Sequence, residues 1–279
     1  MNFLFLITVL LYLATTIFHV LNLALGERND AVSIRSRIEM IAFWVTIFSF
    51  SFLTLFIILW WIRQSYFPIT KWSDSIAFFA WTITLVYLII VRLTKLRTLG
   101  SFVMPVAFIF ILISYSFSET TSHRSELFTT NWVIPHIILI ILGYASFIAA
   151  FGFGLMYLIA EKKIREKNQS LFSNLLPPLD VADELGYIFI LLGVILLSIG
   201  VIVGSFLPTY LKDLPWNWFD PKVISTLVTW LIYVVYIGIR QFWGWRGRKA
   251  AFLSILGFLA VLCTYVGVDL TLDSLHEFQ

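Results

Sequence analysis

Residues 184–208 read ELGYIFILLGVILLSIGVIVGSFLP, and this stretch decides the class of fold. After Glu184 it carries no charge, over a length that crosses the ~30 Å hydrocarbon core of a bilayer as a helix. It does not alternate with period two, so a helix is the only economical structure for it in lipid. Gly193, Gly200 and Gly204 predict close packing of this helix against a neighbour.

Seven further apolar runs of similar length occur in the 279-residue chain, which is 60% hydrophobic, 13% charged and has a mean hydropathy of +0.92. The eight predicted spans are 3–25, 38–62, 73–93, 99–118, 131–160, 184–208, 223–243 and 249–270. The fifth continues into the basic segment EKKIREK, and Pro177 and Pro178 break the chain before the sixth. The sequence therefore predicts an all-α, polytopic integral membrane helix bundle, with residues 1–279 forming a single transmembrane domain in the cell membrane.

The basic residues are distributed unevenly between alternate connections. Fourteen of the 19 Lys and Arg residues share one set: Arg28, Arg35, Arg37, Arg92, Lys95, Arg97, Lys162, Lys163, Arg165, Lys167, Arg240, Arg246, Arg248 and Lys249. The positive-inside rule places this set in the cytoplasm, which predicts an N-out/C-out topology and an outer-face loop at 209–222. The net charge of +3 is too mild to indicate a nucleic acid partner. The single cysteine, Cys263, excludes an internal disulfide, so any thiol chemistry belongs to a partner.

The predicted outer loop is rich in tryptophan and ends in Pro215-Trp216-Asn217-Trp218-Phe219-Asp220-Pro221-Lys222. Three of the four histidines, His123, His136 and His276, fall on the same predicted side. Imidazole is a common ligand of haem iron, aromatic rings can lie against a porphyrin, and nearby cations can pair with its propionates. The candidate cations are Arg124, Lys212 and Lys222.

Simpler interpretations of these residues exist. Tryptophans at a membrane boundary are usually interfacial anchors, and a single interfacial histidine is more often hydrogen-bonded than ligating. His19, near the cytoplasmic end of the first span, either bonds to a neighbouring helix or is a functional intramembrane group. Spacing alone leaves these alternatives open.

Several segments resemble the cytochrome c assembly family, which includes the CcsA, ResC and CcmC haem-handling proteins and the HemX proteins. Residues 218–222 (WFDPK) and 229–233 (TWLIY) are similar to the family's tryptophan-rich "WWD" segment. The likeness continues through 244–247 (GWRG), 256–258 (LGF), 264–268 (TYVGV) and Leu275-His276, and earlier in Trp132 to His136. It covers about residues 64–279.

The resemblance implies that haem b is held at the extracytoplasmic face and presented to apocytochrome c. His136 and His276 would be the axial iron ligands, and the platform would consist of Trp216, Trp218, Phe219, Asp220 and Pro221. A CcsB/ResB-type membrane partner is expected, and the protein would act as a component of a cytochrome c haem lyase.

Two departures from the family pattern point to an alternative. Where haem-transporting members carry a second, intramembrane histidine pair, this chain has Tyr66 and Gly238. These changes count against transmembrane haem transport and bring the chain closer to HemX-like regulators of haem biosynthesis, which lack lyase activity. A transporter of another substrate is disfavoured, because Glu39 and Asp74 are among the few acids in the predicted spans.

Overall fold

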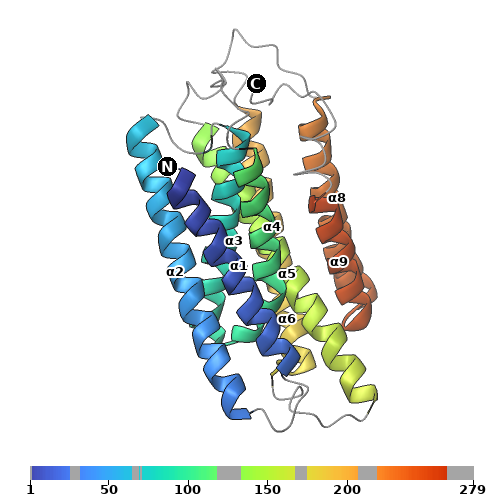
Figure 1. The fold of residues 1–279 in the computed structure, drawn as a ribbon. Coiled ribbons are helices and arrows are strands. Elements are labelled where there is room, and N and C mark those ends of the chain that lie inside the picture. Colours follow the sequence, from blue (N-terminus) through green and yellow to red (C-terminus); the bar gives the residue numbers. More distant parts are fainter. Residues whose placement is uncertain are drawn as a thin grey trace.

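The structure is a computed structural model that describes residues 2–25, 32–64, 69, 71–117, 133–166, 175–206 and 219–262. Within these ranges the chain forms eight α-helices, a short 3-10 helix and no strand (Figure 1). The helices are α1 (Asn2–Leu25), α2 (Val32–Gln64), α3 (Trp72–Thr94), α4 (Gly100–Ser116), α5 (Val133–Arg165), α6 (Leu179–Ser205), α8 (Pro221–Trp243) and α9 (Arg248–Leu262), with the 3-10 helix η1 at Arg97–Leu99.

Each predicted span coincides with a helix, which confirms the polytopic membrane bundle. Seven helices in the described part of the chain are long and apolar enough to cross a membrane, and α9 is the eighth, shorter one. The last residues of the predicted eighth span, 263–270, lie outside the described residues. Pro178 occupies the N-cap position of α6, so the helix begins directly after the two prolines, as the break predicts.

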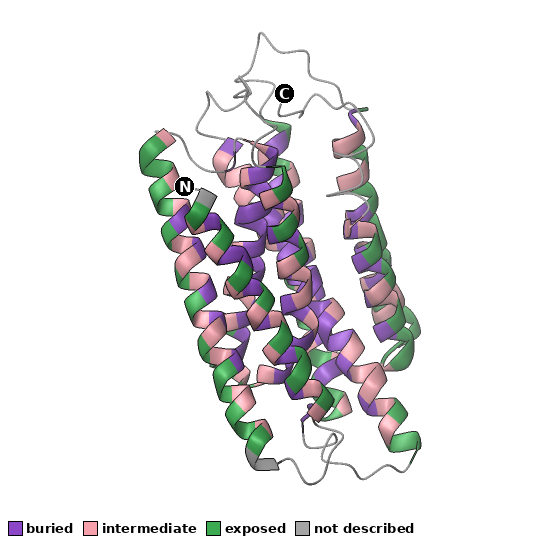
Figure 2. Ribbon diagram, viewed as in Figure 1, coloured by how far each residue is buried: buried purple, intermediate pink, exposed green. Residues whose placement is uncertain are grey.

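The centre of the bundle is α5. In its most apolar stretch 67% of the residues are buried, against 17% in α8, which lies at the periphery. Buried side chains concentrate where α3, α4 and α5 face one another, while exposed Leu, Ile and Phe side chains cover the outside (Figure 2). An apolar exterior of this kind is suited to lipid.

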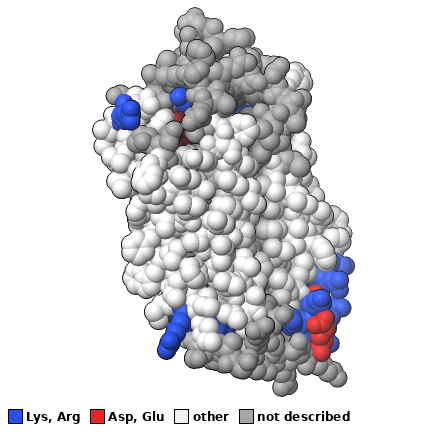
Figure 3. All heavy atoms as spheres, viewed as in Figure 1, with Lys and Arg blue, Asp and Glu red and all other residues white. Residues whose placement is uncertain are grey.

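Charged residues lie at the two ends of the bundle and leave the middle of the visible face uncharged (Figure 3). The helices α1, α3, α5 and α8 end where α2, α4, α6 and α9 begin, and we name this the basic end (Figure 1). The described members of the predicted cytoplasmic set all lie there, whereas Arg63, Lys71 and Lys222 lie at the opposite end. The alternation of basic and non-basic connections is thus confirmed.

Glycines allow α5 and α6 to approach each other closely. A Cβ on Gly143 would lie 3.2 Å from the carbonyl oxygen of Gly193, and a Cβ on Gly193 would overlap the ring of Phe147. A Cβ on Gly200 would lie 2.9 Å from Cγ1 of Ile140. The prediction that the glycines of the sixth span serve close packing is confirmed for Gly193 and Gly200.

A stripe of buried polar residues runs along α1. Its members follow one another three or four positions apart, so they share one face of the helix, and they are Thr8, Tyr12, Thr15, His19 and Asn22, each at most 1% exposed. The stripe bonds to three different helices, through Thr15 to Ser49 (2.8 Å), Tyr12 to Thr84 (3.0 Å) and the carbonyl of His19 to the hydroxyl of Ser101 (2.7 Å). These bonds fix the rotation of α1 against α2, α3 and α4.

Candidate functional site

His136 lies in the first turn of α5, at the end of the bundle opposite the basic end. Its Nδ1 lies 2.7 Å from the carbonyl oxygen of Gly200 on α6. A carbonyl oxygen can only accept, so Nδ1 carries the hydrogen, and the lone pair of the neutral imidazole is on Nε2. The ring lies over Gly204, where a Cβ would come within 2.6 Å of Nδ1. Gly204 therefore provides space for the imidazole, a more specific role than the predicted close helix packing.

This arrangement is the one that metal-binding histidines usually have. Such a histidine donates its other ring hydrogen to a carbonyl or carboxylate, which fixes the tautomer and the orientation of the ring. The bond to Gly200 thus fixes the orientation of the His136 ring from α6, and its role as a ligand stays a prediction.

The segment Phe219-Asp220-Pro221 forms the start of α8. The Asp220 carboxylate accepts the N–H of Lys222 (2.8 Å), and Pro221 occupies the first helical position. Aspartate at the N-cap followed by proline is a strong signal for a helix start, which explains why the chain turns into α8 here. Asp220 is 1% exposed, whereas Phe219 is 80% exposed.

His136 and Asp220 lie at a similar level of the bundle. The hydroxyl of Tyr144 on α5 bonds to that of Thr226 on α8 (3.2 Å). At 1.5 Å per residue, His136 lies about 12 Å along α5 from this contact, and Asp220 lies about 9 Å along α8 in the same direction. Two of the predicted site elements are thus brought to one end of the fold.

The remaining predicted site residues, Trp216, Trp218 and His276, lie outside the described residues, as does Tyr66. Their predicted roles stay predictions. Among the residues that the structure describes, no group of three or more His, Cys, Asp or Glu side chains could hold a metal ion.

The segment 229–233, which carries part of the family likeness, packs α8 against its neighbours. Trp230 donates its indole N–H to Ser198 on α6 (2.8 Å). Tyr233 is fully buried and stacks on Phe147 of α5 with ring centroids 3.7 Å apart. Gly257 on α9 leaves the space that the Tyr233 ring fills. These residues hold the helix that begins at Asp220 in place.

His19 lies far from His136, towards the basic end of α1. Its Nε2 bonds to the hydroxyl of Thr46 on α2 (3.0 Å), which confirms the simpler interpretation of a histidine that bonds to a neighbouring helix. Thr46 itself donates to the carbonyl of Ala42 (2.7 Å), so Nε2 of His19 must be the donor in their contact. His19 therefore does not join the candidate site.

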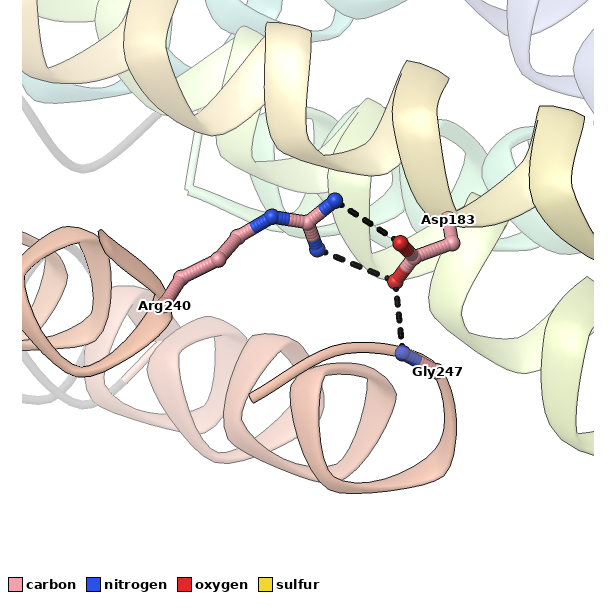
Figure 4. A network of polar contacts seen from close by, with 3 residues as sticks. All are labelled: Asp183, Arg240 and Gly247. Carbon is pink, nitrogen blue, oxygen red and sulfur yellow. Dashed lines mark hydrogen bonds and ion pairs between the residues drawn. The ribbon is translucent and has the colours of Figure 1, made fainter. Parts of the chain in front are cut away.

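A largely buried ion pair that the sequence analysis missed connects α6 with α8, and its carboxylate also binds the turn between α8 and α9. The guanidinium of Arg240 donates to both carboxylate oxygens of Asp183, at 3.0 and 2.7 Å, and the N–H of Gly247 donates to the same carboxylate at 2.9 Å (Figure 4). Arg240 also lies over the ring of Tyr187, 4.3 Å from its centroid. The only indication in the sequence was that Asp183 directly precedes the predicted sixth span and that Arg240 lies near the end of the predicted seventh span.

At Gly238, one of the two departures from the family pattern noted in the sequence, an added Cβ would meet no atom within 4 Å. Glycine at this position is therefore not required by packing against any described residue.

Comparison with known proteins agrees with these observations. Residues 69–276 match the sequence model of the family described as cytochrome C assembly protein. Similar proteins include the cytochrome c biogenesis protein CcsA of Chlamydomonas reinhardtii (30% identity over 235 residues, covering 81% of this chain and 65% of the relative). The proteins of the same name from Pyropia yezoensis (30% identity; 78% and 80% covered) and Prochlorococcus marinus strain NATL1A (28%; 81% and 81%) are also similar. The match thus spans somewhat less than two thirds of the Chlamydomonas protein.

Proposed function

Because this chain belongs to the cytochrome c assembly protein family, we propose that it is a membrane protein of cytochrome c biogenesis that binds haem b. Haem would be held at the end of the bundle where α5 and α8 begin, on the extracytoplasmic side, and presented there to apocytochrome c. The relatives named above, each called a cytochrome c biogenesis protein, support this role. The side follows from the positive-inside rule applied to the basic end.

The observation that carries the proposal is the bond between His136 and Gly200. The bond assigns the hydrogen to Nδ1, so the lone pair of the neutral ring is on Nε2, which is the proposed donor atom to iron. Gly204 on the next turn of α6 leaves space for the ring in this orientation. An imidazole held in one tautomer by a backbone carbonyl fits the donor set of a haem site.

His276 is proposed as the second axial ligand, with Trp216, Trp218 and Phe219 as the surface against which the porphyrin lies. In the described part of this platform, Phe219 exposes most of its ring at the start of α8. Asp220 and Pro221 contribute by fixing where α8 begins, at a level of the bundle similar to that of His136. Bound haem supplies the vinyl groups to which the thiols of an apocytochrome c add.

Lyase activity would require components outside this chain. Its single cysteine provides no dithiol, so a separate reductant must keep the apocytochrome thiols reduced. A CcsB/ResB-type membrane protein is the proposed partner.

The test is the visible absorption spectrum of the purified protein, oxidised and reduced, beside the double variant His136→Ala/His276→Ala. We expect a Soret band in the parent and its loss in the variant. His123→Ala is the matched control, since it removes an imidazole from the same predicted side and should leave the band unchanged. Added imidazole should restore part of the band in His136→Ala, which separates a lost ligand from a misfolded protein.

Two results would count against the proposal. Unchanged haem content in the double variant would show that the ligand assignment is wrong. A parent that takes up no haem even after supplementation would favour the HemX-like regulatory role, with the tryptophan-rich loop acting as an interfacial anchor.

A further inference from the structure

The structure joins two segments far apart in the sequence into one positively charged surface. Arg248, at the start of α9, lies 3.9 Å from Glu161 near the end of α5. The surface, which we name the α5/α9 basic patch, consists of Lys162, Lys163, Arg165, Arg246, Arg248 and Lys249, and it also contains Glu161 and Glu166. Six basic and two acidic residues leave it with a net charge of four. Charges of both signs gather in this region of the basic end (Figure 3).

The turn that carries half of this patch has a fixed shape. Gly244 and Gly247 adopt left-handed backbone conformations, with φ of 66° and 65°, which glycine tolerates without strain. The N–H of Gly247 donates to the Asp183 carboxylate (Figure 4). The N–H of Ala251 donates to the carbonyl of Gly247. The basic residues that follow Gly247 therefore stand on a rigid support and not on a loose loop.

The cations of the turn are held by aromatic rings and remain available to an anion. The ammonium of Lys249 lies 4.9 Å from the centroid of Trp245, and the guanidinium of Arg248 lies 5.7 Å from that of Phe252. Arg246 is exposed and makes no ion pair with an acid among the described residues. The Glu161 carboxylate pairs with the guanidinium of Arg165 at 2.7 Å, a shorter distance than the 3.9 Å between Glu161 and Arg248.

Exposed aromatic side chains place the patch at the level of the lipid headgroups. Phe242 and Trp243, the last two residues of α8, are 83% and 71% exposed. Aromatic side chains at the ends of membrane helices are enriched at the boundary between lipid and water. Basic residues one turn further on then lie at the depth of the phosphate groups, where each contributes to the attraction of anionic lipid.

We propose that the α5/α9 basic patch is a binding site for the headgroup of an anionic phospholipid. The phosphodiester would be bound by Arg246, Arg248 and Lys249, and the acyl chains would lie along the apolar surface that ends in Phe242 and Trp243. Arginine suits this ligand because its planar fork matches phosphate geometry. A lipid bound here would tie the end of α5 to the α8–α9 turn.

The experiment is a titration of the purified full-length chain, in neutral detergent, with phosphatidylglycerol, phosphatidylcholine or inorganic phosphate, read as the shift in thermal unfolding. We expect phosphatidylglycerol to raise the unfolding temperature saturably and the other two to have little effect. Arg246→Gln/Lys249→Gln should weaken the phosphatidylglycerol response about 25-fold, at about five-fold per basic residue near the surface. The matched control, Arg92→Gln/Lys95→Gln, removes two exposed charges at the same end, one from the last turn of α3 and one from the residue that follows the helix.

Each alternative outcome would overturn the proposal. An equal response to phosphatidylcholine would show that the acyl chains alone bind. An equal response to inorganic phosphate would show a site for a free anion. Equal weakening in the two double variants would show general attraction by the basic end without a site at the patch. The absence of any response to the three ligands would leave the patch to an acidic protein partner.

Discussion

Replacing Asp183 by asparagine should strongly destabilise the protein. Asparagine keeps the shape of the side chain and can still accept the N–H of Gly247, but it removes the counter-charge of Arg240. The side chains of Arg240 and Asp183 are only 10% and 14% exposed, so the guanidinium would be left with little solvation. The variant therefore isolates the loss of one charge in a buried, doubly hydrogen-bonded pair.

The expected cost follows from this burial. Removing one partner of a buried ion pair costs about 3–5 kcal/mol, because the other charge remains buried. At roughly 2–4 °C per kcal/mol for a large domain, the lower bound corresponds to a fall of roughly 6–12 °C in unfolding temperature. Arg165→Gln is the matched comparison: Arg165 pairs with Glu161 at the same 2.7 Å, but its side chain is 64% exposed. Loss of this exposed ion pair should lower the free energy of unfolding by only about 0–1 kcal/mol.

Thermal unfolding in detergent, followed by tryptophan fluorescence, measures both variants under the same conditions. The double variant Asp183→Asn/Arg240→Met adds a third comparison, because it removes both charges of the pair while the asparagine oxygen can still accept the N–H of Gly247. It should recover most of the stability lost in Asp183→Asn. If Asp183→Asn proves no worse than Arg165→Gln, or if the double variant is worse than the single one, the pair does not stabilise the fold as argued.

Three further predictions concern packing and capping. Gly193→Ala should lower the free energy of unfolding by about 1–3 kcal/mol, because the added Cβ overlaps the ring of Phe147. Gly238→Ala should raise it by about 0.5–1 kcal/mol, because the Cβ meets no atom and alanine favours the helix. Equal shifts in the unfolding temperature of the two variants would contradict the argument. Tyr233→Phe should leave stability unchanged or raise it, because the buried hydroxyl has no hydrogen-bond partner among the described residues; a clear loss in thermal unfolding would reveal a partner. Asp220→Ala should lower the free energy of unfolding by about 1 kcal/mol, because it removes the N-cap of α8, whereas Asp220→Asn should retain the cap. If the stable asparagine variant loses haem, Asp220 has a role in haem binding in addition to capping.

The sequence predicted the helices well because each one is a long apolar run bounded by charges or prolines. Helix ends were less well predicted. α2 begins at Val32, before the predicted span at 38, because the helix continues through Arg35 and Arg37 beyond the membrane boundary. Hydropathy marks where lipid ends and not where the helix ends.

The candidate site was predicted in part. The position of His136 followed from the chain order and charge pattern, but its bond to Gly200 depends on how α5 and α6 are rotated against each other, which no local pattern encodes. Asp183 and Arg240 were overlooked for a related reason. Each is a single charge at the edge of an apolar run, and only the folded bundle shows that they meet.

The polar stripe on α1 has a consequence for how the protein is made. This helix leaves the ribosome before α2, α3 and α4, to which it is hydrogen-bonded in the folded protein. Until those helices are inserted, Tyr12 and His19 face hydrocarbon without their hydrogen bonds, at a cost in free energy for each unsatisfied group. Newly inserted α1 is therefore expected to be stable in lipid only after α2 has supplied Thr46 to His19 and α3 has supplied Thr84 to Tyr12.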